Sequence, residues 1–182
     1  MRLITIDLDR PKKNNVPIAA CIGYFDGMHR GHQMLVEETL SLAEKYGCES
    51  ALITFDPDPW VTVRGDTDVR HISTMRQRID RAMRSGIKNI FILDFTKEMS
   101  QLSPHAFVTE VLGLCNIKAI VCGFDFHYGY RGEGDAESLK QEGLFEVSVV
   151  EEVSSDGEKI SSTRISRLIE NGEMEEAEAL LG

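Results

Sequence analysis

The sequence has few of the features that mark secreted, membrane or metal-stapled proteins. Its four cysteines, Cys21, Cys48, Cys115 and Cys122, lie far apart and form no Cys-x-x-Cys pair. This spacing indicates neither a disulfide framework nor a structural zinc site. The first residues lack the apolar core of a signal peptide, and no apolar run approaches the roughly 18 to 20 residues that a membrane helix needs. We therefore expect a cytoplasmic protein that makes no membrane contact.

Positive charge is also scarce. The chain has 20 Lys and Arg against 30 Asp and Glu, which gives a formal net charge of −10. A general nucleic-acid-binding protein usually presents a basic face, so nucleic acid is not an expected partner. Basic side chains are frequent between residues 64 and 88, where they either form a solvated face or guide anionic substrates. Nothing in the sequence indicates an oligomeric state.

Two common nucleotide-binding motifs are missing as well. The sequence contains neither Gly-x-Gly-x-x-Gly nor Gly-x-x-x-x-Gly-Lys-Ser/Thr, which argues against dehydrogenase-type dinucleotide binding and against P-loop chemistry. At 182 residues, with 42% hydrophobic and 27% charged residues, the chain is long enough to bury a core without staples. We expect residues 1–182 to form one domain.

Short apolar runs rich in β-branched residues alternate with helical patterns along the chain. This alternation is typical of βαβ units, so the predicted fold class is α/β, a Rossmann-like parallel sheet with helices on both faces. The predicted strands are residues 18–22, 51–55, 90–95, 119–122 and 145–150. Helices are expected at 31–46 and 73–85, after Ser103, up to Asn171 and near the C-terminus, and residues 123–135 should form a loop.

One segment, residues 23–32 with the sequence GYFDGMHRGH, joins the first predicted strand to the first long helix. Backbone donors and the positive end of the helix converge there, and anions bind readily at such places. Gly23, Gly27 and Gly31 allow a tight turn and a close approach of phosphate. His29 and His32 are three residues apart and share one face if the helix has begun.

Imidazole groups in this position suit nucleotidyl transfer. They can donate to phosphate oxygens and, when protonated, stabilise the charge that develops on an attacked α-phosphorus. No covalent intermediate is needed, because such transfers depend on positioning and electrostatics, with metal ions sharing the neutralisation. Two alternatives stay open: surface histidines without a function, and a zinc site formed by Asp26, His29 and His32.

The segment resembles the signature of the HxGH nucleotidyltransferase superfamily. Within that superfamily, the sequence looks like the FMN adenylyltransferase module of bacterial FAD synthetases, which commonly pair it with a riboflavin kinase. Residues 23–32, 54–59, 123–129 and 160–165 carry the resemblance in the family's order and cover essentially the whole chain. The riboflavin kinase domain is expected to be absent, because the chain stops about where that domain would begin.

The resemblance implies roles for individual residues. His29 and His32 would be catalytic and would hold the phosphates of ATP, while Mg²⁺ would arrive with ATP and need no metal site of the protein. The other implied or candidate ATP-binding residues are Gly23, Phe25, Asp26, Gly31, Asp125, Ser162, Thr163, Arg164 and Arg167. The implied flavin-binding residues are Pro57, Pro59, Phe126 and Tyr128. Structural alternatives are helix capping by Ser162 and Thr163 and anchoring by Phe126 and Tyr128.

Two residues depart from the family's pattern. Asp58 stands between two prolines where a basic or amide residue is usual, which places an acid near an anionic acceptor. Ser166 stands where an ATP-facing arginine is expected. Arg167, about 40° around the helix from Thr163, and Arg164 are the candidates to replace that arginine.

The expected reaction is the transfer of AMP from ATP to FMN, giving FAD and pyrophosphate. Three alternatives are another acceptor, CTP as the donor, and a flavin- or nucleotide-binding module without catalysis.

Overall fold

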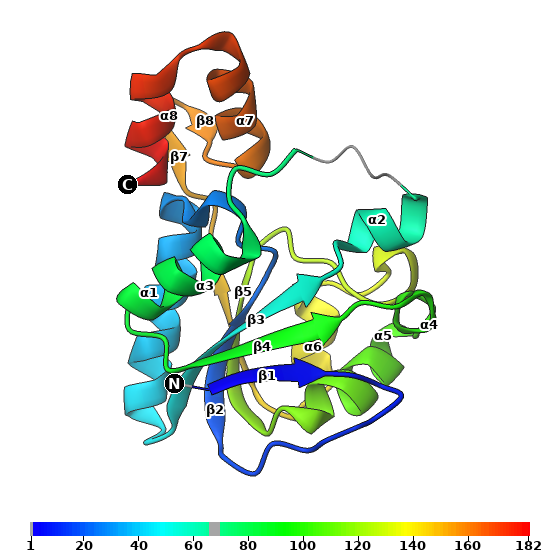
Figure 1. Cartoon of the computed structure of the whole chain (residues 1–182). Coiled ribbons are helices and arrows are strands. Elements are labelled where there is room, and N and C mark those ends of the chain that lie inside the picture. Colours follow the sequence, from blue (N-terminus) through cyan, green and yellow to red (C-terminus); the bar gives the residue numbers. More distant parts are fainter. Residues whose placement is uncertain (1, 66–69) are drawn as a thin grey trace.

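The fold is built on one parallel sheet. The structure is a computed structural model that describes residues 2–65 and 70–182. Its six-stranded sheet has the order β1-β4-β3-β2-β5-β6, and every neighbouring pair is parallel (Figure 1). The strands are β1 Arg2–Ile6, β2 Ile18–Ile22, β3 Glu49–Asp56, β4 Asn89–Asp94, β5 Ile117–Gly123 and β6 Glu146–Val150. A short antiparallel hairpin pairs β7 Ser154–Ser155 with β8 Glu158–Lys159.

Helices and helical turns connect these strands. The long ones are α1 Arg30–Lys45, α3 Met75–Arg84, α7 Ser162–Asn171 and α8 Met174–Leu181. The shorter ones are η1 Asp26–Met28, α2 Pro59–Arg64, α4 Lys97–Ser100, α5 Pro104–Ala106, η2 Phe107–Val111, η3 Leu112–Leu114, η4 Tyr130–Gly132 and α6 Ala136–Gln141. Local signals set several boundaries. Ser103 caps α5 with Pro104 as its first residue, and α7 ends at Gly172 in the left-handed conformation.

The predicted α/β fold is confirmed, and all five predicted strands are present within a few residues. Several short elements were missed, among them strand β1 and helix α2. Strand β1 lies at the edge of the sheet and pairs only with β4 among the described strands, so its side chains alternate in exposure and form no continuous apolar run. Helix α2 is six residues long and buries none of them, so it shows no periodic buried face. Part of the basic stretch at 64–88, residues 66–69, lies outside the described residues.

Alternate side chains of the central strands pack into two separate core clusters. In β2, Ile18, Ala20 and Ile22 join one cluster, whereas Ala19 and Cys21 join the other. The second cluster includes side chains of α1 and α3, so these helices cover one face of the sheet (Figure 1). The opposite face is covered by η2, η3 and α6. All five residues of β2 are buried for this reason.

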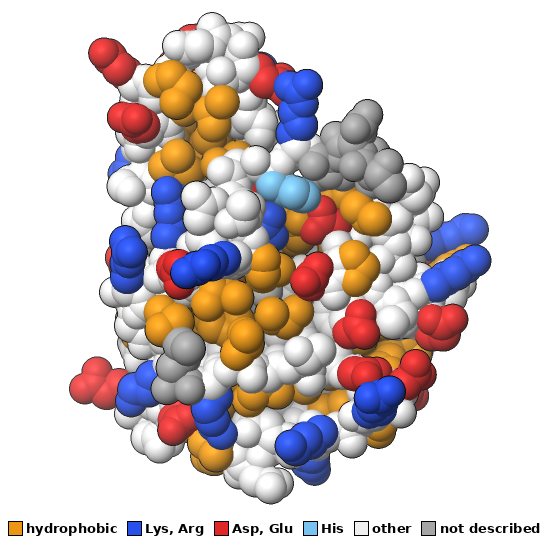
Figure 2. Space-filling view, in the orientation of Figure 1, with side chains coloured by type: hydrophobic (Ala, Val, Ile, Leu, Met, Phe, Trp, Pro, Cys, Tyr) orange, Lys and Arg blue, Asp and Glu red, His pale blue; other side chains and the backbone are white. Residues whose placement is uncertain are grey.

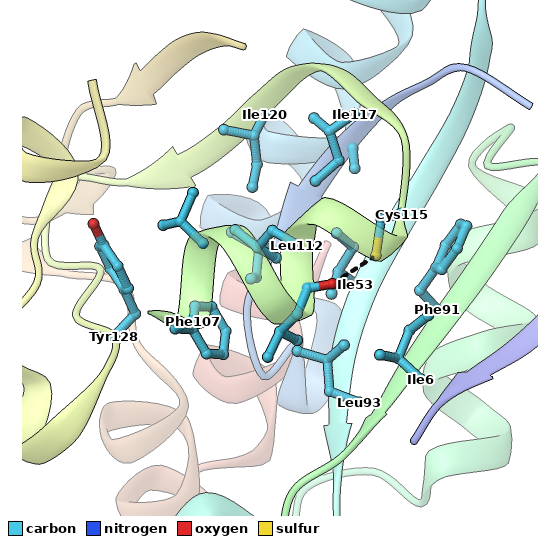
Figure 3. Packing of buried hydrophobic residues seen from close by; sticks show 14 of the residues in the cluster. Ile6, Ile53, Phe91, Leu93, Phe107, Leu112, Cys115, Ile117, Ile120 and Tyr128 are labelled. Atoms are coloured by element: carbon cyan, nitrogen blue, oxygen red, sulfur yellow. Dashed lines mark hydrogen bonds between the residues drawn. The ribbon is translucent and has the colours of Figure 1, made fainter. Parts of the chain in front are cut away.

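The first core cluster, on the sheet face opposite α1 and α3, is built around η2 and η3. Figure 3 shows Phe107, Leu112 and Cys115 of this helical segment packed against strand residues, and the Cys115 thiol donates to the carbonyl of Val111 at 3.8 Å. Burial raises the pKa of the Cys115 thiol to about 12. This cysteine is therefore a small hydrophobic core residue, as the wide spacing of the cysteines indicates.

The strand order creates a switch point between β2 and β5. From β2 the chain continues to β3 on one side, whereas from β5 it continues to β6 on the other side. Ligands of open α/β sheets bind in the crevice outside the carboxyl ends of strands at such a point. The GYFDGMHRGH segment follows β2, and the segment predicted as a loop, residues 123–135, begins at the end of β5. The fold thus brings these two sequence motifs to the same edge of the sheet.

The C-terminal elements form a small cluster of their own beside the start of α1. Ile160, Ile165, Leu168, Ala177 and Leu180 pack together from the β8–α7 connection, α7 and α8 (Figure 1). Figure 2 shows that Lys, Arg, Asp and Glu side chains are interspersed over the described part of one face. Among residues 2–65 and 70–182, no helix has both the length and the apolar character required to cross a membrane.

Candidate active site

A cleft of about 1180 Å³ opens at the carboxyl ends of the parallel strands. Each of β2 to β6 contributes lining residues at or just beyond its end: Gly23, Phe55, Phe95, Gly123 and Val150. The lining combines two kinds of side chain. The polar residues include His29, His32, Asp125, Lys159, Ser161 and Ser162. The aromatic residues are Tyr24, Phe55, Trp60, Phe95, Phe107, Phe124, Phe126, Tyr128 and Tyr130.

The two histidines lie in stacked contact at the start of α1. Their ring centroids are 3.7 Å apart, with an angle of 18° between the planes. His29 is the N-cap of α1, and its Nδ1 accepts a hydrogen bond from the backbone N–H of His32 at 3.4 Å. A ring nitrogen that accepts carries no proton, so the neutral His29 imidazole carries its proton on Nε2. Nε2 is therefore the donor that His29 can offer to a ligand.

Both histidines are neutral at pH 7 in the ligand-free site. Burial, reinforced by the nearby charge of Lys159, lowers the pKa of His29 to about 4. Burial, together with His29 and Arg78, holds the pKa of His32 well below its usual range. Negative charge brought close to these rings raises their pKa values. The pair therefore starts as neutral hydrogen-bonding groups and gains affinity for protons when an anion binds.

Two glycines of the motif leave the space that the turn and the His29 ring require. A Cβ at Gly31 would lie 3.2 Å from ring atoms of His29, so a side chain there pushes the imidazole out of position. Gly27 has φ +76°, a conformation that L side chains rarely adopt, and a Cβ there would lie 3.1 Å from Ile72 and Leu181. The close approach of the first helical turn to His29 thus depends on glycine at position 31.

Phe25 and Asp26 lie behind the cleft lining and hold the turn in place. Phe25 is fully buried in the core. The Asp26 carboxylate accepts hydrogen bonds from the backbone N–H groups of Ile72 at 3.0 Å and Ser73 at 2.8 Å, and from the Ser73 hydroxyl at 2.8 Å. Arg78 lies 3.4 Å from the same carboxylate. These bonds fasten the motif to the segment that begins α3.

Of the remaining residues predicted for ATP, Gly23, Asp125 and Ser162 line the cleft with the histidines. The Ser162 hydroxyl donates to the carbonyl of Asp26 at 3.0 Å, which joins the start of α7 to the motif. The cap of α7 is Ser161, whose side chain accepts from the backbone N–H of Arg164 at 3.2 Å. Thr163 is exposed and is not part of the lining.

The two arginines considered as substitutes for Ser166 point to other partners. Arg164 is only 6% exposed and donates to the carbonyls of Ser155 and Glu158 at 3.0 Å each. It also donates to the Glu176 carboxylate at 2.9 Å, so it joins the β7–β8 hairpin to α8. Arg167 is exposed and pairs with Glu158 at 3.0 Å. Neither arginine lines the cleft.

Lys159 is one of several cleft residues that the sequence analysis missed. It lies at the end of β8, lines the cleft, and pairs its ammonium group with the Asp125 carboxylate. The ammonium also lies 4.7 Å from the ring centre of Phe124. Its position directly before the Ile160-Ser161-Ser162 segment was the available signal. A single lysine in a two-residue strand produces no pattern that distinguishes it from a surface residue.

The residues predicted for the flavin are mostly brought together. Pro59, Phe126 and Tyr128 line the cleft, whereas Pro57 is exposed and outside the lining. The rings of Phe126 and Tyr128 are stacked, with centroids 5.7 Å apart and 16° between their planes. Tyr128 also belongs to the core cluster and lies 5.7 Å from the ring of Phe107. Its ring thus anchors the loop and forms part of the lining.

Fold and site together define a class of protein: a Rossmann-like α/β protein with an HxGH turn and an aromatic-lined cleft at the switch point of its sheet. The sequence profile of the FAD synthetase family matches residues 11–164. Because this match covers most of the chain, the protein belongs to the FAD synthetase family.

Individual relatives agree with this membership. A bifunctional riboflavin kinase/FMN adenylyltransferase of Listeria monocytogenes is 37% identical over 88% of this chain and 52% of its own length. An FAD synthetase of the same organism is 31% identical over 94% of this chain and 71% of its own length. The chain spans about half the length of several bifunctional relatives, including one from Bacillus subtilis that is 30% identical and 58% covered.

A solved structure supports the fold. The crystal structure of a macrolide-efflux protein from Streptococcus pneumoniae superimposes with a TM-score of 0.86 at 30% identity. The match covers 99% of this chain and 61% of that protein. The fold described here, including its C-terminal elements, therefore occurs within a longer solved chain.

Proposed function

We propose that this protein is an FMN adenylyltransferase, which transfers AMP from ATP to FMN and gives FAD and pyrophosphate. The observation that carries the proposal is the stacked pair His29 and His32 at the start of α1, inside a cleft that also has a wall of aromatic rings. The polar groups suit a triphosphate, and the rings suit an isoalloxazine. The relatives named FMN adenylyltransferase and FAD synthetase support the same substrates.

The phosphates of ATP are proposed to lie against the start of α1. Unpaired backbone N–H groups and the helix dipole favour an anion there, and the Nε2–H of His29 adds a donor. Among the described residues, the Nδ1 atom of His32 is buried without a hydrogen-bond partner. Leaving such an atom unsatisfied costs about 1–3 kcal/mol. In the tautomer with the proton on Nδ1, His32 would satisfy it by donating to a phosphate oxygen.

Mg²⁺ is proposed to arrive with the phosphates of ATP, where it would neutralise part of their charge. In the parts of the chain that the structure describes, no three His, Cys, Asp or Glu residues are arranged to hold a metal ion. A zinc site formed by Asp26, His29 and His32 is also disfavoured, because the Asp26 carboxylate already accepts hydrogen bonds from the backbone N–H groups of Ile72 and Ser73.

In the proposed reaction, a phosphate oxygen of FMN attacks the α-phosphorus of ATP in line. A new phosphorus–oxygen bond forms as the bond to the bridging oxygen breaks, and pyrophosphate leaves with the bonding electrons. His29 and His32 would donate hydrogen bonds to the phosphate oxygens that gain charge. Lys159 would add a positive charge beside Asp125. No proton transfer to the attacking phosphate oxygen is required, because FMN is already an anion.

The direct test is incubation of the protein with ATP, Mg²⁺ and FMN, followed by separation of flavins by chromatography and an assay for pyrophosphate. We expect equal amounts of FAD and pyrophosphate. Parallel reactions with CTP in place of ATP, and with pantetheine phosphate in place of FMN, should give much less pyrophosphate. Tight FMN or ATP binding without any FAD would contradict catalysis and favour a binding module.

A further inference from the structure

Asp58 occupies an N-cap position without capping its helix. It precedes Pro59 at the start of α2, yet its side chain makes no hydrogen bond to the helix, although aspartate is one of the preferred capping residues. Its carboxylate instead accepts a hydrogen bond from the Tyr24 hydroxyl. The Nε2 atom of His71 lies 2.9 Å from the other carboxylate oxygen. Asp58 therefore links α2 to the GYFDGMHRGH segment and to the chain before α3.

The contacts with Tyr24 and His71 also fix the direction of the Asp58 carboxylate. Its side chain is 11% exposed, and Asp58 is not part of the cleft lining, although its neighbours Pro59 and Trp60 are. One carboxylate oxygen accepts from the Tyr24 hydroxyl, and the other, which makes no hydrogen bond to the described residues, lies beside the His71 ring. The acid between the two prolines is thus compatible with a phosphate-bearing ligand in the cleft.

The partners of Asp58 are themselves held in place. Arg78, which is 4% exposed, lies with its Nη2 3.3 Å from the Tyr24 hydroxyl and 3.4 Å from Asp26. Its guanidinium carbon is 4.2 Å from the centre of the Tyr24 ring. The Nδ1 atom of His71 lies 3.4 Å from the Tyr24 hydroxyl. Tyr24 is therefore held at its hydroxyl by Asp58, His71 and Arg78, and on its ring by the Arg78 guanidinium.

Trp60 rests on this fixed ring. The indole and the Tyr24 ring meet edge to face, with centroids 4.9 Å apart. Trp60 lines the cleft and is 38% exposed. Helix α2 stands at the tip of β3 (Figure 1) and buries none of its residues, so core packing does not set the position of the indole. Its position depends on Tyr24, on the Asp58 contacts and on the Thr62 hydroxyl, which donates to the Phe95 carbonyl at 2.8 Å.

We propose that Asp58 and His71 are positioning residues that hold Tyr24 and Trp60 as the wall of the acceptor subsite, and that Trp60 selects an acceptor with a flat, polycyclic aromatic ring. The inference rests on the proposed function and deepens it. A half-exposed indole beside other aromatic side chains offers a face or edge for such a ring. A non-aromatic acceptor gains little from this wall.

The chain contains a single tryptophan, so its intrinsic fluorescence reports on Trp60 alone. Titration of FMN into the ATP-free protein should quench this fluorescence and give a dissociation constant. The constant should rise about three- to tenfold in Asp58→Ala and His71→Ala. Asp58→Asn keeps an oxygen that can accept from Tyr24 and should recover much of the loss. The double variant Asp58→Ala/His71→Ala should bind FMN about as weakly as either single variant, because both act through one contact.

Steady-state FAD formation separates positioning from general damage. In Trp60→Ala, Asp58→Ala and His71→Ala, the KM for FMN should rise while the KM for ATP stays within about twofold, and Trp60→Phe should recover part of the change. His105→Ala is the matched control. It breaks another histidine–carboxylate contact, to Glu142 at 2.8 Å, at a place outside the cleft lining, and should change neither KM.

Two results would overturn the inference: unchanged FMN affinity in both Asp58 variants and in His71→Ala, or an equal rise of both KM values, which indicates a general structural role. Failure of the proposed function itself is seen separately, as absence of FAD with the unmodified protein. In that case the fluorescence titration, which needs no catalysis, still decides whether Asp58 and His71 govern the binding of the flavin ring.

Discussion

The Nδ1 atom of His29 accepts a hydrogen bond from the backbone N–H of His32, so the first histidine caps the helix that carries the second. This relationship ties the candidate chemistry to the stability of α1. It also fixes which ring nitrogen of His29 is free to donate. A substitution at position 29 therefore has to be chosen so that it separates the two roles.

His29→Asn makes that separation, because asparagine is a good N-cap but has no imidazole. We expect turnover to fall about 100-fold or more, whereas the free energy of unfolding changes by less than about 1 kcal/mol. His29→Ala should lose both activity and about 1 kcal/mol of stability. FAD formation and urea unfolding measure the two effects. A rate for His29→Asn within a few fold of the unmodified protein would remove His29 from the mechanism.

The lowered pKa of His29 makes stability depend on pH. In the unfolded chain the imidazole takes up a proton near its ordinary pKa of 6.5, whereas in the folded protein it does so near 4. The unfolded state therefore binds more protons between these values, and stability is lost as the pH falls through that window. For this one group the loss at pH 5 is roughly 2 kcal/mol.

The measurement is urea unfolding at pH 7 and pH 5, with His29→Asn as the control that lacks the titrating ring. The unmodified protein should lose more stability between the two pH values than this variant does. Equal losses in both proteins would mean that His29 is not buried in its neutral form.

Lys159 is one cause of the low His29 pKa, after burial. Replacing it by methionine removes a positive charge but keeps a similar length of apolar chain. The pKa of His29 should rise toward its ordinary value in Lys159→Met, which an NMR titration of the imidazole protons can follow. The KM for ATP should rise as well, since the cleft loses a cation beside its phosphate-binding end. If the pKa of His29 does not change in this variant, Lys159 lies too far from His29 to lower it.

Arg164 and Arg167 are expected to behave differently although they are close in sequence. Arg164→Ala leaves the Ser155 and Glu158 carbonyls and the Glu176 carboxylate without their buried partner, and should cost about 2–4 kcal/mol of stability. Arg167→Ala removes only an exposed ion pair and should cost less than about 1 kcal/mol. Neither should change the KM for ATP by more than about twofold. A large rise of that KM in Arg167→Ala would restore it as a substitute for the arginine missing at Ser166.

The sequence was sufficient for the elements that carry strong local signals. Strand β2 and helix α1 were predicted because a buried apolar run is followed by a helical pattern. Helix α7 was predicted because hydroxyl residues precede it and Gly172 follows it. Strand β1 and helix α2 were missed because neither has a continuous buried face. Their places are set by partners far along the chain, such as β4 for β1 and the Phe95 carbonyl for α2.

The same limit applies to the site. A motif shows which residues are near a ligand, but tertiary partners decide the direction of each side chain. Asp26 turns toward Ser73, and Arg164 turns toward Glu176, and neither partner could be inferred from the sequence around the motif. The contact between Asp58 and His71 likewise joins two segments that no local pattern relates. The roles assigned to individual residues in binding ATP and FMN stay predictions.

The central claim is tested most directly with ATP that is radioactively labelled at the α-phosphorus. After incubation with FMN and Mg²⁺, the label should appear in FAD, with unlabelled pyrophosphate as the second product, and His32→Asn should abolish the transfer while remaining folded. Label that stays in ATP, or that appears only in ADP or free AMP, would contradict adenylyl transfer to FMN by this cleft.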